Sequence, residues 1–112
     1  MKGILPSLRE DKRYIVFEVL SEDKVKDFKN IRTDVVNGIQ NFLGQLETSK
    51  AGVMLLKDLW FKDKQKGIIS VNSKYVDKVK TSLMLIKKLE GKDVILNNIA
   101  VSGMLNKAKK HV

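Results

Sequence analysis

The sequence predicts an α+β fold in which two helices cover one face of a four-stranded antiparallel sheet. Segments with an alternating apolar pattern and segments with a 3.6-residue apolar period follow one another in the order β-α-β-β-α-β. The link between the two middle strands is short enough for an antiparallel hairpin. This order is that of ferredoxin-like and RRM-like sandwiches. A chain of 112 residues, 43% of them hydrophobic, fits one such domain.

The first strand is predicted at residues 13–20, where apolar side chains alternate onto one face. A helix is expected to follow, from an N-cap at Ser21 or Asp23 to about Leu46. Its apolar stripe is the strongest in the chain and comprises Val25, Phe28, Ile31, Val35, Val36, Ile39, Phe42, Leu43 and Leu46. Arg32 falls inside this arc, so either its side chain snorkels at the edge or the helix begins later.

The remaining elements are predicted from the same patterns. We expect strands at residues 53–62, 68–72 and 92–101, and a second helix at residues 74–89. Ser73 caps this helix and Gly91 ends it. The sheet face away from the helices inherits apolar side chains from three strands, so it needs a covering segment or a partner. The C-terminal tail can supply part of that cover.

We expect a single domain over residues 1–112, with an N-terminal arm (1–12), a βαββαβ core (13–102) and a basic helical tail (103–112). No apolar run approaches the roughly 18 residues that span a bilayer, and the first residues do not read as a signal peptide. The absence of cysteine excludes disulfides and thiolate metal sites. A cytoplasmic protein without membrane contact is expected.

The sequence offers no catalytic or metal-binding set of its own. The only histidine, His111, lies next to the C-terminus, where a positioned general base is not expected. No glycine-rich phosphate loop is present. Small phosphatases of this fold rely on an arginine and an asparagine near such a loop, whereas the arginines here are Arg9, Arg13 and Arg32. An enzyme of the acylphosphatase type is therefore disfavoured, and no bound cofactor is expected.

The charge of the chain points to a polyanionic partner. Its net charge is +9, and residues 74–112 hold 9 basic but only 3 acidic side chains. An uneven basic excess of this kind suits a nucleic acid. Base stacking is worth ~1–3 kcal/mol per base, but the predicted third strand lacks the aromatic side chains for it. Any RNA contact should therefore be mainly electrostatic and based on shape.

Three groups of basic residues are the candidate RNA contacts: one in the arm, one along the second helix and one in the tail. They comprise Arg9, Lys12 and Arg13; Lys74, Lys78 and Lys88; and Lys107, Lys109 and Lys110. A solvated surface accounts for each lysine equally well. Arg9 and Arg13 rank first, because arginine contacts phosphate in a bidentate manner.

Four short motifs recur together in one known family. They are Pro6-Ser7-Leu8-Arg9 followed by residues 13–18, Leu43-Gly44, residues 67–72 with Val76, and Val101-Ser102-Gly103 with Lys107. In this order and spacing the chain resembles archaeal ribonuclease P protein component 2 over nearly its whole length. The family commonly has threonine after Ser-Gly, whereas Met104 stands there in this sequence, which removes a possible hydroxyl contact.

The resemblance implies a subunit of ribonuclease P, the ribonucleoprotein endonuclease that removes the 5′ leader from precursor tRNA. It implies that the ribonuclease P RNA performs the hydrolysis with magnesium, and that the polypeptide is not catalytic. It further implies a heterotetramer with protein component 3, other ribonuclease P proteins as neighbours, and only indirect contact with precursor tRNA.

Two questions stay open at this point. A general basic RNA-binding or ribosome-associated protein accounts for the charge and the fold, but not for the N-terminal and C-terminal motifs together. Within the ribonuclease P interpretation, we expect the arm and the open sheet face to contact protein. The second helix and the tail are then expected to contact RNA.

Overall fold

The structure is a computed structural model that describes residues 11–112. Four strands, Lys12–Leu20 (β1), Met54–Phe61 (β2), Lys66–Asn72 (β3) and Ile95–Ser102 (β6), form one sheet in the order β2-β3-β1-β6. Every pairing in this sheet is antiparallel. The predicted ferredoxin-like arrangement is therefore confirmed. The predicted arm lies outside the described residues apart from its last two positions, and Arg9 with it.

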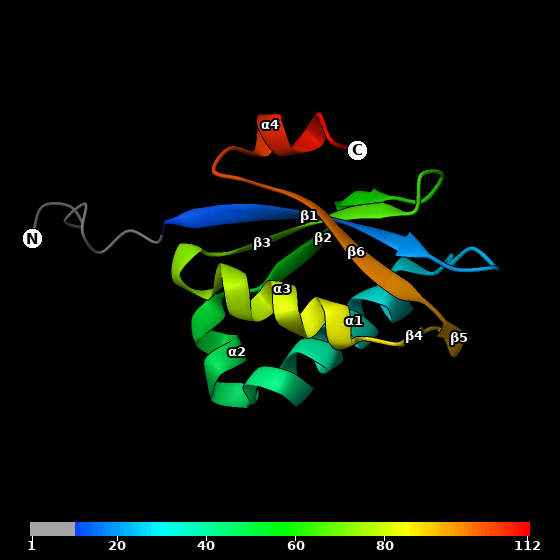
Figure 1. Cartoon of the computed structure of the whole chain (residues 1–112), viewed down its shortest axis with the longest axis horizontal. Coiled ribbons are helices and arrows are strands. Elements are labelled where there is room, and N and C mark those ends of the chain that lie inside the picture. Colours follow the sequence, from blue (N-terminus) through cyan, green and yellow to red (C-terminus); the bar gives the residue numbers. More distant parts are fainter. Residues whose placement is uncertain (1–10) are drawn as a thin grey trace, which may run out of the picture.

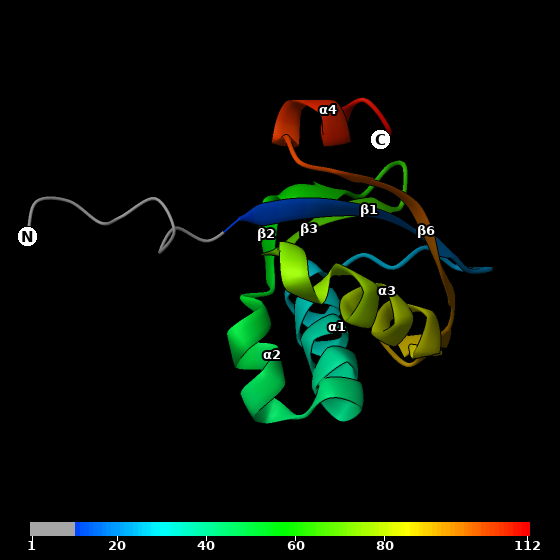
Figure 2. The same cartoon turned by 60° about the vertical axis from the view of Figure 1, so that its left-hand side comes forward.

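The helices divide between the two faces of the sheet. Helices α1 (Phe28–Leu43), α2 (Gln45–Ala51) and α3 (Val76–Leu85) lie on one side, and the short helix α4 (Leu105–Lys109) lies on the other (Figures 1 and 2). The main core fills the space between the sheet and the larger helices. Its fully buried side chains include Ile15, Phe17, Ile31, Val35, Ile39, Ile69, Val71, Val79 and Leu83.

The first helix is shorter than the pattern predicts. Its N-cap is Asp27, whose side chain accepts a hydrogen bond from the N–H of Lys29 at 3.0 Å. Gly44, with a φ of 86°, ends α1, and the chain turns into the separate helix α2. The prediction of one helix to Leu46 was thus wrong, because this glycine conformation changes the direction of the chain. Phe42 and Leu46 lose their predicted place in the core and are 48% and 67% exposed.

The late start of α1 is explained first by Gln65, at the end of the turn between β2 and β3. Its side-chain amide accepts the N–H of Val25 at 2.9 Å and donates to the carbonyl of Val25 at 3.0 Å. The backbone of Gln65 has a φ of 53°, which is uncommon outside glycine. Val25 is thereby held in an irregular loop in place of the first helical turn.

Glu90 holds the next two residues of the same loop. Its carboxylate accepts hydrogen bonds from the N–H groups of Lys26 at 2.8 Å and Asp27 at 2.9 Å. These bonds fix the backbone just before α1. Arg32 then lies in the second turn of the helix with an exposed side chain. Of the two predicted explanations for Arg32, the later helix start is the one observed.

A small hairpin follows α3 where the sequence predicted continued helix. Helix α3, preceded by a 3-10 turn at Ser73–Tyr75, ends at Leu85, and strands Lys88–Leu89 (β4) and Lys92–Asp93 (β5) pair antiparallel. The two residues between them, Glu90 and Gly91, have φ values of 54° and 73°. Paired positive φ values are those of a type I′ hairpin turn. The last strand of the sheet consequently starts at Ile95, three residues later than expected.

Strand β2 at the edge of the sheet contains a wide bulge. Its register passes from Leu55 opposite Ile69 to Trp60 opposite Gly67, so the four residues 56–59 of β2 face a single residue of β3, Ile68. The bulge interrupts the flat edge that would otherwise invite pairing with another chain. Beyond it, Trp60 stacks on Phe17 with ring centroids 6.3 Å apart.

Helix α4 covers the sheet face that the larger helices leave open. Ala108 is fully buried there with Val16, Leu59 and Ile68, and Leu105 packs beside them. The prediction that the tail supplies cover is therefore confirmed. The same contact covers part of the face where a protein contact was expected, and that expectation stays a prediction.

Candidate RNA interface

The tail group of lysines forms an exposed surface on α4. Lys107, Lys109 and Lys110 project outward because Ala108 between them faces the sheet. The end of the chain is held as well, since Lys64 Nζ donates to the carbonyl of Val112 at 3.1 Å. We call these three lysines the α4 surface. Their charges are concentrated on one short helix that the sheet holds in place.

The structure brings Arg13 of the arm group next to the turn that precedes this surface. The guanidinium of Arg13 lies beside Gly103 in the turn before α4, 3.9 Å from where a Cβ of that residue would stand. Arg13 forms an ion pair with Asp11 at 2.5 Å, and this hydrogen bond lowers the pKa of the Asp11 carboxyl. Lys12 is the neighbour of Arg13 at the start of β1. Arg13 and the α4 surface are therefore close enough to act on one ligand.

The turn before α4 also explains how Met104 is accommodated. The hydroxyl of Ser102 accepts the N–H of Met104 at 3.1 Å and donates to its carbonyl at 3.0 Å. The Met104 side chain itself is 55% exposed. The turn is thus held by Ser102 through the backbone, whatever side chain follows the glycine.

The lysines predicted along the second helix do not form one patch. Lys74 belongs to the 3-10 turn before α3, whereas Lys88 belongs to β4 beyond the far end of that helix. Lys88 lies 3.6 Å from Asp93, and Lys78 lies 3.9 Å from Glu47. Exposed pairs of this kind are worth about 0–1 kcal/mol, so they do not prevent these lysines from binding phosphate.

The sheet itself offers no surface for stacking bases. Ile68 of β3 faces α4 and is fully buried beneath it. Tyr14, the aromatic residue of β1 on this face, is partly buried in the same cluster. RNA-recognition motifs stack bases on aromatic side chains of their first and third strands. Here α4 occupies that place, which leaves charge and shape as the means of contact.

A further basic cluster surrounds the start of α1, and the sequence analysis did not find it. A groove of about 570 Å³ lies between α1 and β2, and five basic side chains line it. They are Lys26, Lys29, Arg32, Lys57 and Lys62. The two sequence signals were the odd position of Arg32 and the absence of an acidic residue from the first turn of α1. We call this feature the α1 groove.

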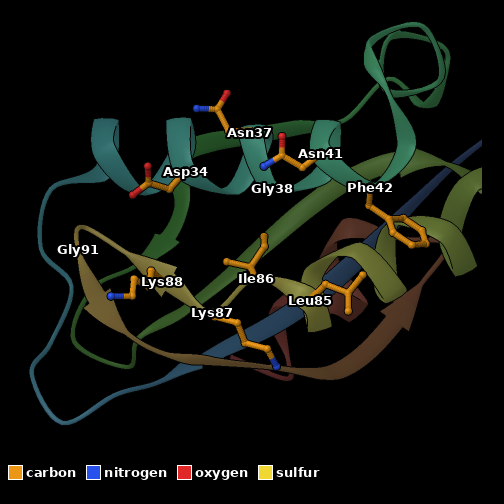
Figure 3. A pocket seen from close by; sticks show the side chains of 10 residues that line it. All are labelled: Asp34, Asn37, Gly38, Asn41, Phe42, Leu85, Ile86, Lys87, Lys88 and Gly91. Carbon is orange, nitrogen blue, oxygen red and sulfur yellow. The ribbon is translucent and has the colours of Figure 1, made fainter.

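A second groove, of about 670 Å³, separates α1 from the segment that follows α3. Figure 3 shows Ile86 directed toward Gly38, with Phe42 and Leu85 at one end and Lys87 and Lys88 on the wall opposite α1. A Cβ on Gly38 would stand 2.5 Å from Ile86 Cγ1, so glycine allows this close approach. The exposed Phe42 and Leu85 give the groove an apolar end.

Two kinds of site were not found in the part of the chain that the structure describes. Among residues 11–112, no three or more His, Cys, Asp or Glu side chains are grouped so as to hold a metal ion. No helix of these residues has the length and apolar character to cross a membrane.

Comparison with curated proteins finds several archaeal relatives of nearly equal length, each named ribonuclease P protein component 2. The protein from Pyrococcus furiosus is 36% identical over 97% of this chain and 88% of its own length. The protein from Methanocaldococcus jannaschii is 34% identical over 97% of this chain and 78% of its own. The protein from Pyrococcus abyssi is 32% identical over 98% of this chain and 91% of its own length.

Comparison with solved structures supports the fold. One chain in a cryo-EM structure of yeast ribonuclease MRP matches with a TM-score of 0.65 over 87% of this chain and 77% of its own. The sequence identity of that pair is only 15%, so the match concerns the fold alone. The family model described as the Rpp14/Pop5 family matches residues 13–112. With this match and the archaeal relatives together, the chain belongs to the Rpp14/Pop5 family.

Proposed function

We infer that this chain is a protein subunit of ribonuclease P, and we propose that it supports the catalytic RNA by neutralising phosphate charge. The similarity to archaeal ribonuclease P protein component 2 extends over nearly the full chain, which supports its place in that ribonucleoprotein. The single structural observation that carries the RNA contact is the α4 surface. Its lysines are exposed on a helix whose other side is fixed to the sheet.

The proposed mechanism is electrostatic. RNA segments repel one another through their phosphates, and lysines placed between them release condensed counterions as they bind. The α4 surface, with Arg13 beside it, brings positive charge to the RNA without a flexible linker. We propose that this lowers the magnesium concentration that the RNA needs to fold and cleave. In this proposal the RNA uses the magnesium, the polypeptide binds no cofactor, and the protein is not itself catalytic.

We propose protein component 3 as the protein partner, in a heterotetramer, with other ribonuclease P proteins nearby. Helix α4 already covers Val16, Leu59 and Ile68 on the open sheet face, so we propose a different apolar surface for this contact. The exposed side chains of Phe42 and Leu85, 48% and 54% accessible in the groove of Figure 3, suit a protein contact. A cytoplasmic location and a single-domain organisation stay predictions.

The direct test is cleavage of precursor tRNA by the ribonuclease P RNA at low magnesium, with and without this chain and component 3. Cleavage that requires both proteins is the expected result. Binding of the pair to the RNA without any effect on cleavage would contradict the proposal. Ribosomal RNA as the main species that copurifies with the chain would favour the ribosome-associated alternative.

The contribution of the α4 surface is measured with a charge-matched pair of variants. Lys107→Gln with Lys110→Gln removes two cations of this surface. Lys24→Gln with Lys50→Gln removes two exposed cations that belong neither to the predicted RNA groups nor to either groove. Each lost phosphate contact lowers the slope of log K against log salt by about 0.7–0.9. We expect a slope smaller than that of the wild type in the α4 variant only. Equal slopes for the two variants would argue against RNA binding by the α4 surface.

A further inference from the structure

The α1 groove gathers positive side chains that form no ion pairs with other described residues. Lys26, Lys29 and Arg32 come from the start of α1, and Lys57 and Lys62 come from β2 and the turn after it. Within residues 11–112, none of these five side chains takes part in an ion pair. The one carboxylate of the groove, Asp27, already caps the helix and accepts the N–H of Lys29.

This arrangement works against the stability of the helix it surrounds. The N-terminus of an α-helix carries roughly half a positive charge, which acidic side chains in the first turn normally offset. The first turn of α1 has no acidic residue and contains Lys29 instead. The five cations outnumber the two carboxylates at this terminus, Asp27 and Glu90, so positive charge that repels the helix dipole remains in excess. An anionic ligand would remove this repulsion. On a surface that binds no ligand, the repulsion would only destabilise the helix.

The wall of the groove supplies a second, independent observation. Trp60 lines the groove and is only 9% exposed, and its indole N–H has no hydrogen-bond partner among the described residues. A buried donor without a partner is uncommon in folded proteins and often marks the place of a ligand or an ordered water. Phe28 lines the same groove. The groove therefore combines cations that form no ion pairs within residues 11–112 with an aromatic wall made by Phe28 and Trp60.

We propose that the α1 groove binds the phosphate backbone of RNA, as a contact separate from the α4 surface. This inference rests on the proposed function, because it names a second site for the same RNA. Helices α1 and α4 lie on opposite faces of the sheet (Figure 2), so the two sites bind different stretches of the RNA. The subunit then holds two RNA segments with the sheet between them.

The test compares affinity for the ribonuclease P RNA across a range of salt concentrations, using the full chain. Lys29→Gln with Arg32→Gln removes two groove cations, and Lys57→Gln with Lys62→Gln repeats the change from the other wall. Lys24→Gln with Lys50→Gln is the control of equal charge, because neither residue lines a groove. Two lost phosphate contacts should lower the slope of log K against log salt by roughly 1.4–1.8 in each groove variant. The control should keep most of the wild-type slope.

Thermal unfolding separates loss of binding from loss of structure. Removing positive charge near the start of α1 should leave the melting temperature of the Lys29→Gln, Arg32→Gln variant unchanged or raised. Combining these changes with Lys107→Gln and Lys110→Gln should give additive losses of binding free energy, because independent sites add. No further loss in the combined variant would show one site instead of two and overturn the separate contact.

The remaining outcomes distinguish this inference from the proposed function. If wild-type protein restores cleavage and the groove variants bind the RNA with the wild-type slope, the groove inference fails and the subunit assignment stands. If the groove variants bind RNA normally but no longer assemble with the other ribonuclease P proteins, the groove binds an acidic protein segment instead. If the wild-type protein itself has no effect on cleavage, the proposed function fails first.

Discussion

Two residues with left-handed backbones, Gln65 and Glu90, decide where the first helix begins. Each stands in a turn between two strands and reaches with its side chain to the loop before α1. A left-handed conformation of a residue other than glycine costs free energy and persists only where the surroundings fix it. Here the hydrogen bonds to Val25, Lys26 and Asp27 offset that cost.

Glu90 should make the stability of the protein depend on pH. Partial burial raises the pKa of its carboxyl, but the N–H groups of Lys26 and Asp27 and the charge of Lys92 together lower it below its ordinary value of 4.5. The folded state therefore binds the proton less readily than the unfolded state. The stabilisation is fully present above about pH 4.5 and is lost as the pH falls through the folded pKa.

We predict that Glu90→Gln lowers the free energy of unfolding by about 1–2 kcal/mol at pH 7, because the charged acceptor is lost. The difference in the free energy of unfolding between this variant and the wild type should shrink as the pH falls below 4.5. Urea unfolding at a series of pH values measures both effects. A difference in unfolding free energy that stays constant from pH 7 to pH 3 would contradict the stabilising role of the Glu90 carboxylate.

Gly67 in β3 is required by the aromatic pair beside it. A Cβ at this position would stand 2.7 Å from Phe17 Cζ and 3.1 Å from Trp60 Cε3. We predict that Gly67→Ala lowers the free energy of unfolding by about 1–3 kcal/mol, which is typical of overpacking in a core. Gly103→Ala is the control, because its Cβ would meet nothing closer than 3.9 Å. Similar midpoints of denaturant unfolding for the two variants would disprove the steric explanation.

Among single residues, the sequence was sufficient to identify the tail lysines but not the cations of the α1 groove. Lys107, Lys109 and Lys110 are close together along the chain, so their clustering was visible without a structure. Lys29 and Lys57 meet only because α1 and β2 lie side by side. The order of charges along the sequence does not show that these residues are close in space.

Helix α4 shields apolar side chains of the sheet from water. It covers apolar side chains of three strands through Ala108, Leu105 and their neighbours. We predict that Ala108→Glu displaces α4, exposes this face and lowers the midpoint of unfolding, because a buried charge without a partner is costly. Asn106→Glu adds the same charge on the exposed side of α4 and should have little effect. Binding of a hydrophobic dye that does not differ between the two variants would contradict this role.

The errors in the predicted elements have a common physical cause. Apolar periodicity located α1, α3 and all four strands of the main sheet, because each has one face in the core. Periodicity did not show the break at Gly44 or the hairpin around Glu90. Both depend on positive φ values. Glu-Gly is not among the residue pairs that usually indicate such a turn. Ile86 and Leu89 lie within the range predicted for the second helix, and both are buried although neither is in a helix.

At the scale of the whole molecule, the order of elements determined the topology, because short links and antiparallel pairing leave few ways to arrange four strands. The sequence did not determine which surfaces stay exposed. The open sheet face was expected to contact protein, and the sequence did not show how much of this face α4 covers.

We predict that the chain unfolds as one cooperative unit, because a single layer of strands contributes to both clusters of buried side chains. The only tryptophan, Trp60, lies in the main cluster and reports on it by fluorescence. Its unfolding curve should coincide with the loss of helical signal in circular dichroism. Separate transitions would show that the chain contains more than one unit.

The two side chains that hold the loop before α1 also determine when that loop takes its final shape during folding. Gln65 is 40 residues from Val25 along the chain, and Glu90 is 64 and 63 residues from Lys26 and Asp27. Each turn must have formed and reached the loop before its own side chain can bind there, so we predict that these contacts form after the rate-limiting step. Substitution of Gln65 or Glu90 should therefore accelerate unfolding in stopped-flow experiments and leave the refolding rate nearly unchanged. The start of α1, and the α1 groove beside it, is then the part of the protein that sets how long the native state survives.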